Sequence, residues 1–457
     1  MFHLPLQLQQ MVFITHHPIF THRPFFLQPE DFVELPRRGP PPMIIGLGGG
    51  GARIAPAVTL YFFWEQCRPH VPLRHVMKNQ RRIRTPVHIA STSSIFLLLL
   101  MPIQLHATEA VTPQQIDTVF SHLIAANAPG AAVLVIHNGR PVFQRSYGIS
   151  DLRSRTKITP QTNFRLASVT KQFTAMAIML LVHDSKLRYD DHLTDILPDF
   201  PAYGRAITIR HLLNHTSGLQ DYEDLMPQPA PKLPVEQVQM HDAGVLELLK
   251  QQKATKFTPG SKWAYSNSGY VLLGVVVEKV SGKTFSDFLR DRIFAPLKMT
   301  NTVAYVRGKN EVPNRAFGHS LESDTWKETD QSPTSATLGD GGVYSSIEDL
   351  TKWDQELRQH TLLSEQEMQP ALTPVKVAEG SATEPDGASA TYGFGWFLNP
   401  FHGHVRMWHY GETIGFRTTI QRFVKDDLTV IVLCNRSDLD ASALALQVAD
   451  LFLRTSK

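Results

Sequence analysis

The positions of the strand-like segments most constrain what this chain can fold into. Two such segments come early, at Ala131 to Ile136 and Val142 to Tyr147, and the Asn138-Gly139 pair between them is typical of a tight hairpin. Three more come late, at Val405 to Trp408, Phe416 to Phe423 and Leu428 to Asn435, and a helical stretch from Ala441 to Leu453 follows them. Because helical patterns dominate the interval between the two sets, we predict an α+β fold: one antiparallel sheet flanked by helices, with a helical lobe inserted. An active site would lie where the sheet and the lobe meet.

The first 107 residues differ in pattern from the remainder. Residues 1–76 show no sustained helical or strand period. From Met77, a basic stretch precedes an apolar run from Ile95 to Ile103 and then Leu105-His106-Ala107, which are the three parts of a secretory signal. The apolar run is shorter than the roughly 20 residues that a membrane-spanning helix needs. We therefore expect a non-native upstream extension without a fold at 1–76, a signal peptide at 77–107 and one folded domain at 108–457.

This organisation predicts a periplasmic or secreted protein without a stable transmembrane anchor. The alternative is an uncleaved N-terminal anchor. The oligomeric state is not specified by the sequence.

The charge balance argues against nucleic acid as the main partner. The chain has 45 Lys and Arg against 42 Asp and Glu, but the first 107 residues hold 10 basic and 4 acidic residues, so the remainder has a net charge of −3. No basic run after residue 107 is strong enough to follow a phosphate backbone. The only cysteines are Cys67 and Cys434, which excludes a disulfide framework and zinc sites made of paired cysteines.

Ser168-Val169-Thr170-Lys171 begins a predicted helix that runs to His183. The apolar stripe of this helix is Val169, Phe173, Met176 and Leu180. Ser168 and Lys171 lie off the stripe, three residues apart on a shared face. A serine needs a base within hydrogen-bond reach to act as a nucleophile, and a lysine one turn later can be that base if burial lowers its pKa. A second Ser-x-x-Lys, Ser154 to Lys157, has no apolar helix behind it and is interpreted as a solvated loop.

Tyr265-Ser266-Asn267 precedes a second predicted helix, from about Gly269 to Val280, with Ser281-Gly282 as its stop. A tyrosine whose phenolate is favoured by a neighbouring ammonium can relay protons, and an asparagine beside it can bind the lysine and a substrate amide. The structural alternative is that Asn267 or Ser268 only caps the helix.

His409-Tyr410-Gly411 follows the predicted Val405 to Trp408 strand. The glycine would let a substrate backbone approach the edge of the strand. The alternative is a hairpin histidine and a turn glycine, as in His137-Asn138-Gly139.

In this order the three motifs resemble those of the serine β-lactamase and penicillin-binding-protein superfamily, in the class C-like branch with D-alanyl-D-alanine carboxypeptidases and esterases. Further segments that resemble the family are Leu212 to Leu219, Gly341 to Ser346 and Tyr392 to Trp396. The resemblance covers the chain from about Pro113 to its end. It implies a β-lactamase/transpeptidase-like fold, no cofactor or metal, and a small-molecule or peptide substrate.

The resemblance also implies roles for individual residues. Ser168 would be the acylated nucleophile, Lys171 and Tyr265 would handle protons, and Asn267 would contact the substrate and Lys171. The backbone amides of Ser168 and Glu412 would form the oxyanion hole.

His409 and Gly411 would take the place of the third motif, where many members carry lysine instead of histidine. With an ordinary pKa of about 6.5, His409 supplies no permanent cation for a substrate carboxylate at pH 7, although mild acid would protonate it. Arg417, on the next strand, could substitute.

We therefore expect a secreted serine hydrolase of the peptidase or esterase type, which acts on amide or ester bonds through an acyl-enzyme on Ser168 and can react with β-lactams. The alternatives are a dedicated class C-like β-lactamase and a penicillin-binding sensor that does not turn over. A metallohydrolase using His402, His404 and His409 lacks an accompanying His-Glu-x-x-His or acidic cluster. An α/β-hydrolase would need a Gly-x-Ser-x-Gly turn, which the sequence lacks.

Overall fold

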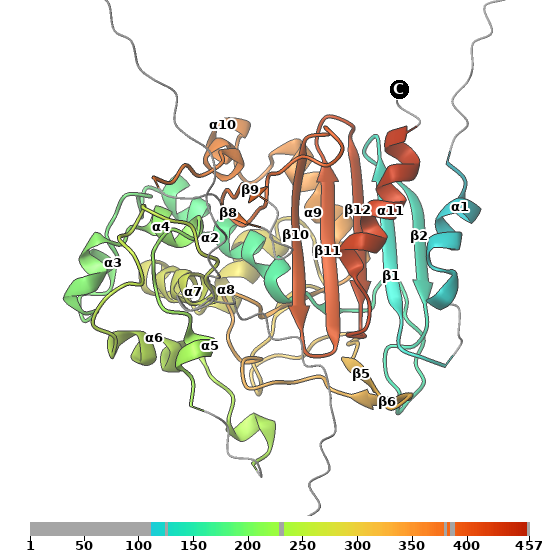
Figure 1. Cartoon of the computed structure of the whole chain (residues 1–457), viewed down its shortest axis with the longest axis horizontal. Helices are drawn as coiled ribbons and strands as arrows, with labels where there is room; N and C mark the ends of the chain where they lie inside the picture. Colours follow the sequence, from blue (N-terminus) through green and yellow to red (C-terminus); the bar gives the residue numbers. More distant parts are fainter. Residues whose placement is uncertain (1–110, 124–126, 228–232, 379–381, 384–388, 455–457) are drawn as a thin grey trace, which may run out of the picture. The chain divides into compact units, whose positions relative to one another are not determined.

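The computed structural model describes residues 111–123, 127–227, 233–378, 382–383 and 389–454 (Figure 1). The predicted upstream extension and signal peptide lie outside the described residues. Among the helices within these ranges, none has the length and hydrophobicity required to cross a bilayer.

The central element is a five-stranded antiparallel sheet that joins the two ends of the domain. Its strand order is β10-β11-β12-β1-β2. The bounds are Ala131–His137 for β1, Arg140–Tyr147 for β2, Arg406–Thr413 for β10, Phe416–Phe423 for β11 and Leu428–Cys434 for β12. Pairing of β1 with β12, in the register Ala131↔Cys434, places the early hairpin beside the late strands. The predicted α+β fold is confirmed.

Two local features set the sheet geometry. Asn138 and Gly139 have φ angles of 51° and 70°, the left-handed values that a two-residue hairpin turn requires. Strand β1 is buried along nearly its whole length because both faces of the sheet are covered. Val133 and Val135 face one hydrophobic cluster, while Ala132 and Leu134 face the other.

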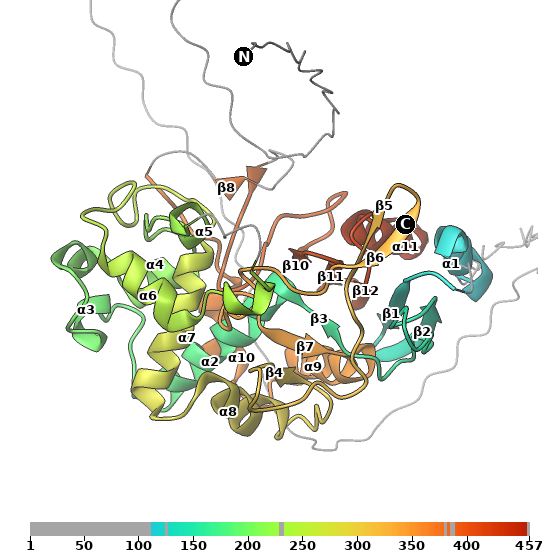
Figure 2. The same ribbon diagram turned by 90° about the horizontal axis from the view of Figure 1, so that it is seen from below.

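Helices cover the two faces of the sheet. On one face, α11 (Ala441–Leu453) packs on β11 and β12 and contacts α1 (Pro113–Val119). On the other face lie α9 (Ile347–Gln359) and the helical lobe, as the view from below shows (Figure 2). The lobe helices are α2 (Lys171–His183), α3 (Leu193–Ile196), α4 (Ile209–Leu213), α5 (Tyr222–Leu225), α6 (Asp242–Lys250), α7 (Asn267–Ser281), α8 (Phe285–Leu289) and α10 (Glu365–Met368).

Smaller sheets complete the domain. Strand β7 (Val343–Ser345) lies between β3 (Phe164–Arg165) and β4 (Val303–Ala304), and β5 (His319–Glu322) pairs with β6 (Thr325–Glu328). Strands β8 (Ala382–Thr383) and β9 (Ser389–Ala390) pair with each other.

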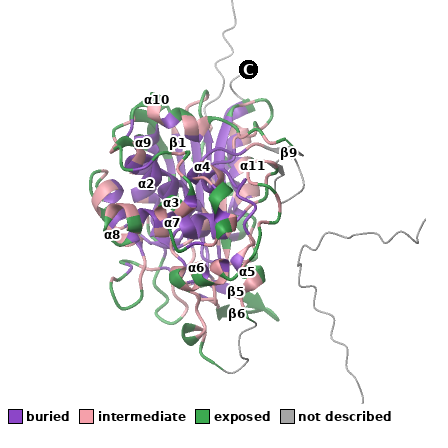
Figure 3. Cartoon of the chain, turned by 90° about the vertical axis from the view of Figure 1, so that its left-hand side faces the viewer, coloured by how far each residue is buried: buried purple, intermediate pink, exposed green. Residues whose placement is uncertain are grey.

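Two predicted elements differ from the structure. Helix α2 has no amphipathic stripe, because every residue from Lys171 to Leu181 is buried between the sheet and the rest of the lobe (Figure 3). Strand β10 continues to Thr413, so that His409-Tyr410-Gly411 lies within a strand and not after one. Elsewhere in the lobe, α8 is followed directly by a π-helical turn, Arg290–Phe294.

Candidate active site

Ser168 lies in a tight 3-10 turn, Ala167–Thr170, that leads directly into α2. Ala167, just before it, is buried and has a φ of 47°, a left-handed conformation that an alanine rarely adopts. The carbonyl of Leu166 fixes this turn by accepting hydrogen bonds from the Val169 amide at 3.2 Å and the Thr418 hydroxyl at 2.8 Å. The sharp turn thus presents Ser168 at the boundary between β11 and the helical lobe.

Lys171 is fully buried one turn after Ser168. Its Nζ donates hydrogen bonds to Ser168 Oγ at 2.9 Å, to Asn267 Oδ1 at 2.9 Å and to the carbonyl of Asp340 at 3.0 Å. Burial lowers the pKa of Lys171 to about 8, although the negative charge of nearby Asp340 and other carboxylates opposes the shift. Near neutral pH the ammonium therefore loses its proton more readily than an ordinary lysine does.

Tyr265 lies against the same ammonium, with its ring centroid 4.9 Å from Lys171 Nζ. Burial raises the pKa of Tyr265 well above its usual value, and its hydrogen bond with Ser168 only partly offsets this effect. The expectation that the lysine would favour the phenolate is wrong, because desolvation outweighs the attraction of one ammonium. Tyr265 is a neutral phenol at physiological pH.

His215 holds the Tyr265 segment from both sides. Its carbonyl accepts a hydrogen bond from the Ala264 amide at 3.0 Å, and its Nδ1 accepts one from the Ser266 amide at 3.1 Å. The His215 ring also packs on the Tyr265 ring, with 4.3 Å between their centroids. This buried histidine belongs to the Leu212 to Leu219 segment, whose role the sequence alone did not specify.

Asn267 is the first residue of α7 and is not its cap. Ser266 is the N-cap, since its side chain accepts a hydrogen bond from the Gly269 amide at 3.1 Å. The Asn267 side chain is therefore available to accept from Lys171, while its Nδ2 donates to Glu223 Oε1 at 3.2 Å. The sequence motif thus contains both the capping residue and the lysine contact.

His409 does not present a cation to the substrate. It is buried in the middle of β10, where Nε2 lies 3.0 Å from the Tyr392 hydroxyl and Nδ1 lies 2.7 Å from the Tyr410 carbonyl. The carbonyl partner indicates that Nδ1 carries the proton and that Nε2 accepts from Tyr392. Burial, reinforced by the charge of Lys171, lowers the pKa of His409 to about 3. The expected protonation in mild acid is therefore wrong.

Gly411 permits close packing of β10 inside the protein. A Cβ atom on Gly411 would lie 2.0 Å from the Leu166 carbonyl oxygen and 2.5 Å from Thr418 Oγ1. Only glycine lets β10 pack against the turn that carries Ser168. The next residue, Glu412, lines the same small cavity as Ser168.

Arg417 closes the turn between β10 and β11. Its Nη1 donates hydrogen bonds to the carbonyls of Thr413 and Phe416, each at 2.8 Å. Its Nε lies 3.7 Å from Glu412 Oε1. The role of Arg417 as a substitute cation stays a prediction.

The cavity at Ser168 has a volume of about 50 Å³. Its lining brings together the predicted residues Ser168, Asn267 and Glu412 with Arg165, Glu223 and Asp340. Sequence reasoning missed the last three. Arg165 precedes the serine by three residues, and Asp340 precedes the Gly341 to Ser346 segment, so proximity to the motifs was the available signal.

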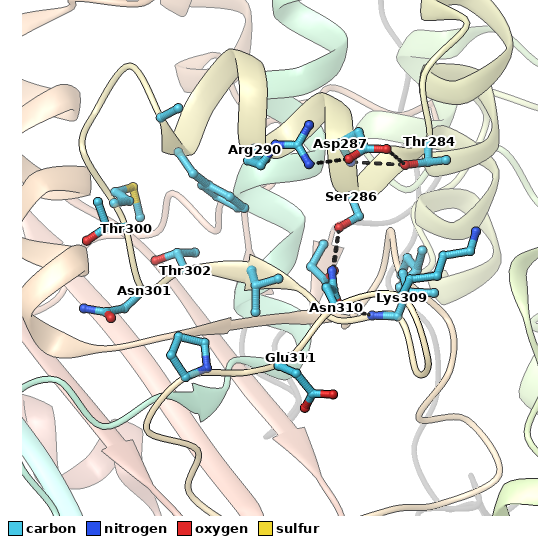
Figure 4. A pocket seen from close by; sticks show the side chains of 18 of the residues that line it. Thr284, Ser286, Asp287, Arg290, Thr300, Asn301, Thr302, Lys309, Asn310 and Glu311 are labelled. Carbon is cyan, nitrogen blue, oxygen red and sulfur yellow. Dashed lines mark hydrogen bonds and ion pairs between the residues drawn. The ribbon is translucent and has the colours of Figure 1, made fainter.

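A larger cavity, of about 790 Å³, lies elsewhere, beside α8 and β4 (Figure 4). Its polar side chains bond one another: Thr284 donates to Asp287 at 2.7 Å, and Asn310 donates to Ser286 at 3.1 Å. None of the predicted site residues lines this cavity.

The three histidines of the metallohydrolase alternative do not converge. His402 contacts Asp450 at 3.1 Å, His404 contacts Asp426 at 2.9 Å, and His409 is buried beside Tyr392. The second Ser-x-x-Lys is not part of the cavity at Ser168. Ser154 and Lys157 are exposed, and the Ser154 hydroxyl shares a hydrogen bond with the Thr156 hydroxyl.

Comparison with known proteins agrees with this geometry. Residues 116–452 match the family described as Beta-lactamase. Penicillin-binding protein 4* of Bacillus subtilis (strain 168) is 32% identical over 338 residues, 71% of this chain and 72% of that protein. The D-aminopeptidase of Brucella canis is 31% identical over 328 residues, 69% of this chain, which span only 58% of the relative's own length.

Two solved structures of similar fold come from the same group of proteins. The penicillin-binding protein from Bacillus halodurans has a TM-score of 0.61 and 28% identity, covering 73% of this chain and 98% of that one. The D-amino acid amidase from Ochrobactrum anthropi SV3 has a TM-score of 0.63 and 25% identity, covering 75% and 97%. The predicted superfamily is confirmed: this chain belongs to the beta-lactamase family and is an enzyme of the serine hydrolase type.

Proposed function

We propose that the protein hydrolyses amide or ester bonds through an acyl-enzyme on Ser168. The observation that supports this most directly is the 2.9 Å hydrogen bond between Ser168 Oγ and a buried lysine whose pKa is lowered to about 8. A neutral amine at this position is a base within reach of the serine proton.

In the proposed acylation, neutral Lys171 accepts the Ser168 proton as Oγ forms a bond to the substrate carbonyl carbon. The carbonyl electrons move to oxygen, where the amides of Ser168 and Glu412 stabilise the charge. The leaving group departs with a proton from the Tyr265 phenol, which regains one from the Lys171 ammonium. Water then attacks the acyl carbon, and the protons move in the opposite direction: Tyr265 and Lys171 take up a proton from the water and return one to Ser168 Oγ. This step releases the acid and restores Ser168.

The test is covalent labelling with a fluorophosphonate, followed by peptide mapping. We expect the label on Ser168, its loss in Ser168→Ala, and near wild-type labelling in Ser154→Ala, the matched control in the exposed Ser-x-x-Lys. A label on any other serine would contradict the assignment. Following a fluorescent penicillin adduct over time separates turnover from the sensor alternative, for which the adduct would persist.

A second candidate within this chemistry is an aminopeptidase or amidase, as in the D-aminopeptidase and D-amino acid amidase relatives. Asp340 favours it, because this buried residue lines the cavity and its Oδ1 has no hydrogen-bond partner in the described part of the protein. A substrate ammonium would pair with that oxygen. We expect faster hydrolysis of D-alanine p-nitroanilide than of its N-acetyl form, and the reverse order would reject this candidate.

We also propose that residues 108–457 are the secreted enzyme and that 77–107 are removed on export. Mass spectrometry of the exported protein would test this, since a mature N-terminus well upstream of Ala107 would contradict it.

A further inference from the structure

His215 has a backbone conformation that is unusual for its residue type. Its φ is 62°, in the left-handed region, and the residue is completely buried. A non-glycine residue held in this region carries strain, and such residues cluster at functional sites. His215 belongs to the segment Leu212 to Leu219, which supplies none of the groups that react in the proposed acylation. What this conformation achieves is seen in the contacts of His215 with the loop before α7.

That loop, residues 251–266, follows the backbone of the histidine segment. The Gly260 amide donates a hydrogen bond to the Thr216 carbonyl at 2.8 Å, and the Ala264 amide donates one to the His215 carbonyl at 3.0 Å. The loop contains no helix or strand of its own. Hydrogen bonds to the neighbouring segment therefore fix its path toward Tyr265.

The His215 ring adds a second hold on the same loop. Its Nδ1 lies 3.1 Å from the Ser266 amide nitrogen. Since an amide N–H can only donate, Nδ1 is the acceptor and Nε2 carries the ring proton. Burial lowers the pKa of His215 well below its ordinary value, so this neutral form persists. His215 thus bonds the peptide groups on both sides of Tyr265.

The surroundings of the ring are aromatic. Its centroid lies 4.3 Å from that of Tyr265 and 4.6 Å from that of Tyr392, and Nε2 has no hydrogen-bond partner in the described part of the chain. A buried N–H group without a partner is unfavourable, so the ring is not explained by its own hydrogen bonding. Its contacts converge on Tyr265, whose ring lies 4.9 Å from Lys171 Nζ.

We propose that His215 is a positioning residue that fixes the Tyr265 phenol for protonation of the leaving group, and that its effect grows with the basicity of that leaving group. A proton donor that moves by about 1 Å loses roughly 100-fold in rate. The inference rests on the proposed acylation of Ser168 and adds what determines which leaving groups the enzyme can expel.

The test compares two esters with the same acyl group, p-nitrophenyl butanoate and ethyl butanoate. p-Nitrophenolate departs without a proton, whereas ethoxide must be protonated as it leaves. His215→Gly removes the ring and still permits the left-handed φ. We expect this variant to lower kcat/KM for ethyl butanoate by about 100-fold, and that for p-nitrophenyl butanoate by less than about fivefold. Acid release follows the ethyl ester, and absorbance follows the other.

His215→Asn should rescue the function, because asparagine tolerates the left-handed region and its amide oxygen can accept from Ser266. We expect its ratio of the two kcat/KM values to stay within about fivefold of the wild-type ratio. The matched control is His319→Ala. His319 is also completely buried with an unpartnered Nε2, and it lies outside the cavity at Ser168, so both esters should change by the same factor.

Equal losses on the two esters in His215→Gly would overturn the inference and make His215 structural. In a Tyr265→Phe background the donor is gone, so His215→Gly should leave the ratio unchanged, and a further shift there would also overturn it. If the glycine variant does not fold, His215→Asn decides. A folded asparagine variant whose ratio shifts as far as that of Tyr265→Phe would contradict the role of Nδ1.

Failure of the proposed function would look different. In that case neither ester turnover nor fluorophosphonate labelling would depend on Ser168. Equal losses on both esters with intact Ser168 labelling contradict only the role of His215.

Discussion

Lys171 can accept the serine proton only in its neutral form, and this requirement sets the pH dependence of acylation. Because burial lowers its pKa to about 8, the neutral fraction rises with pH up to that value and then levels off. For a neutral p-nitrophenyl ester we expect kcat/KM at pH 6 to be about 100-fold below its plateau. His409 adds no step in this range, since its pKa is lowered to about 3.

The measurement is a kcat/KM profile from pH 6 to 10, with Lys171→Ala as the variant that should lose turnover throughout. A wild-type profile that is flat between pH 6 and 9 would show that Lys171 is not the base.

Ala167 is a point of backbone strain next to the nucleophile. Its left-handed φ of 47° suits glycine better than alanine. We expect Ala167→Gly to raise the free energy of unfolding by about 0.5–1 kcal/mol, and Ala167→Val to lower it by more than about 1 kcal/mol, because a β-branched side chain is poorly tolerated in this conformation. Thermal or denaturant unfolding would measure both changes. Equal stability of the glycine and valine variants would contradict the assigned conformation.

Individual roles were only partly predictable. The spacing of Ser168 and Lys171, together with the family resemblance, selected a pair that the structure brings into hydrogen-bond contact. Spacing could not reveal that Tyr265 and His409 are desolvated, because burial depends on segments distant in sequence, such as Tyr392 beside His409. The charge state of a site residue is a tertiary property.

Among the elements, β10 is the one whose packing most directly controls the site. Gly411 brings it against the Leu166 carbonyl, where a Cβ atom would clash at 2.0 Å. We expect Gly411→Ala to push β10 away from the turn that carries Ser168 and to lower kcat/KM by about 100-fold or more.

Gly274→Ala in α7 is the control, because its added Cβ would meet atoms no closer than 3.4 Å and alanine favours the helix. Wild-type kinetics for Gly411→Ala would show that the position of β10 is not critical.

Strands and helices were predictable to different degrees. The apolar runs and the Asn138-Gly139 turn located the strands well, since alternation and turn chemistry are local signals. The length of β10 was underestimated because His409 is a polar residue that the protein buries completely, while Tyr410 is only partly buried against the neighbouring aromatic side chains. The burial of α2 on all sides was missed because helices of the lobe cover the side that a surface helix would expose.

At the scale of the whole molecule, Asn435 connects segments from both ends of the domain. Its Oδ1 accepts from the Gly130 amide at 2.8 Å, while its Nδ2 donates to the carbonyls of Ile149 at 3.1 Å and Phe317 at 3.0 Å. Removing the side chain leaves several buried backbone groups unpaired. We therefore expect Asn435→Ala to lower the free energy of unfolding by about 2–4 kcal/mol.

Gln359→Ala, at an exposed position of α9, should change stability by less than about 0.5 kcal/mol. Denaturant unfolding would measure both variants, and similar values for the two would contradict the linking role of Asn435.

The pairing of β1 with β12 also determines when activity can first appear. Ala131 and Cys434 are neighbours in the sheet, although nearly the whole domain lies between them in sequence. A growing chain can form the lobe helices early, but the sheet cannot close until its last strand has left the ribosome, and closing so long a loop is slow. The strand that carries Glu412 is joined to the N-terminal hairpin only through this late ladder. An unfinished chain lacks both Glu412 and the Thr418 hydroxyl that holds the turn of Ser168, so we expect no hydrolase activity until the late strands have joined the sheet.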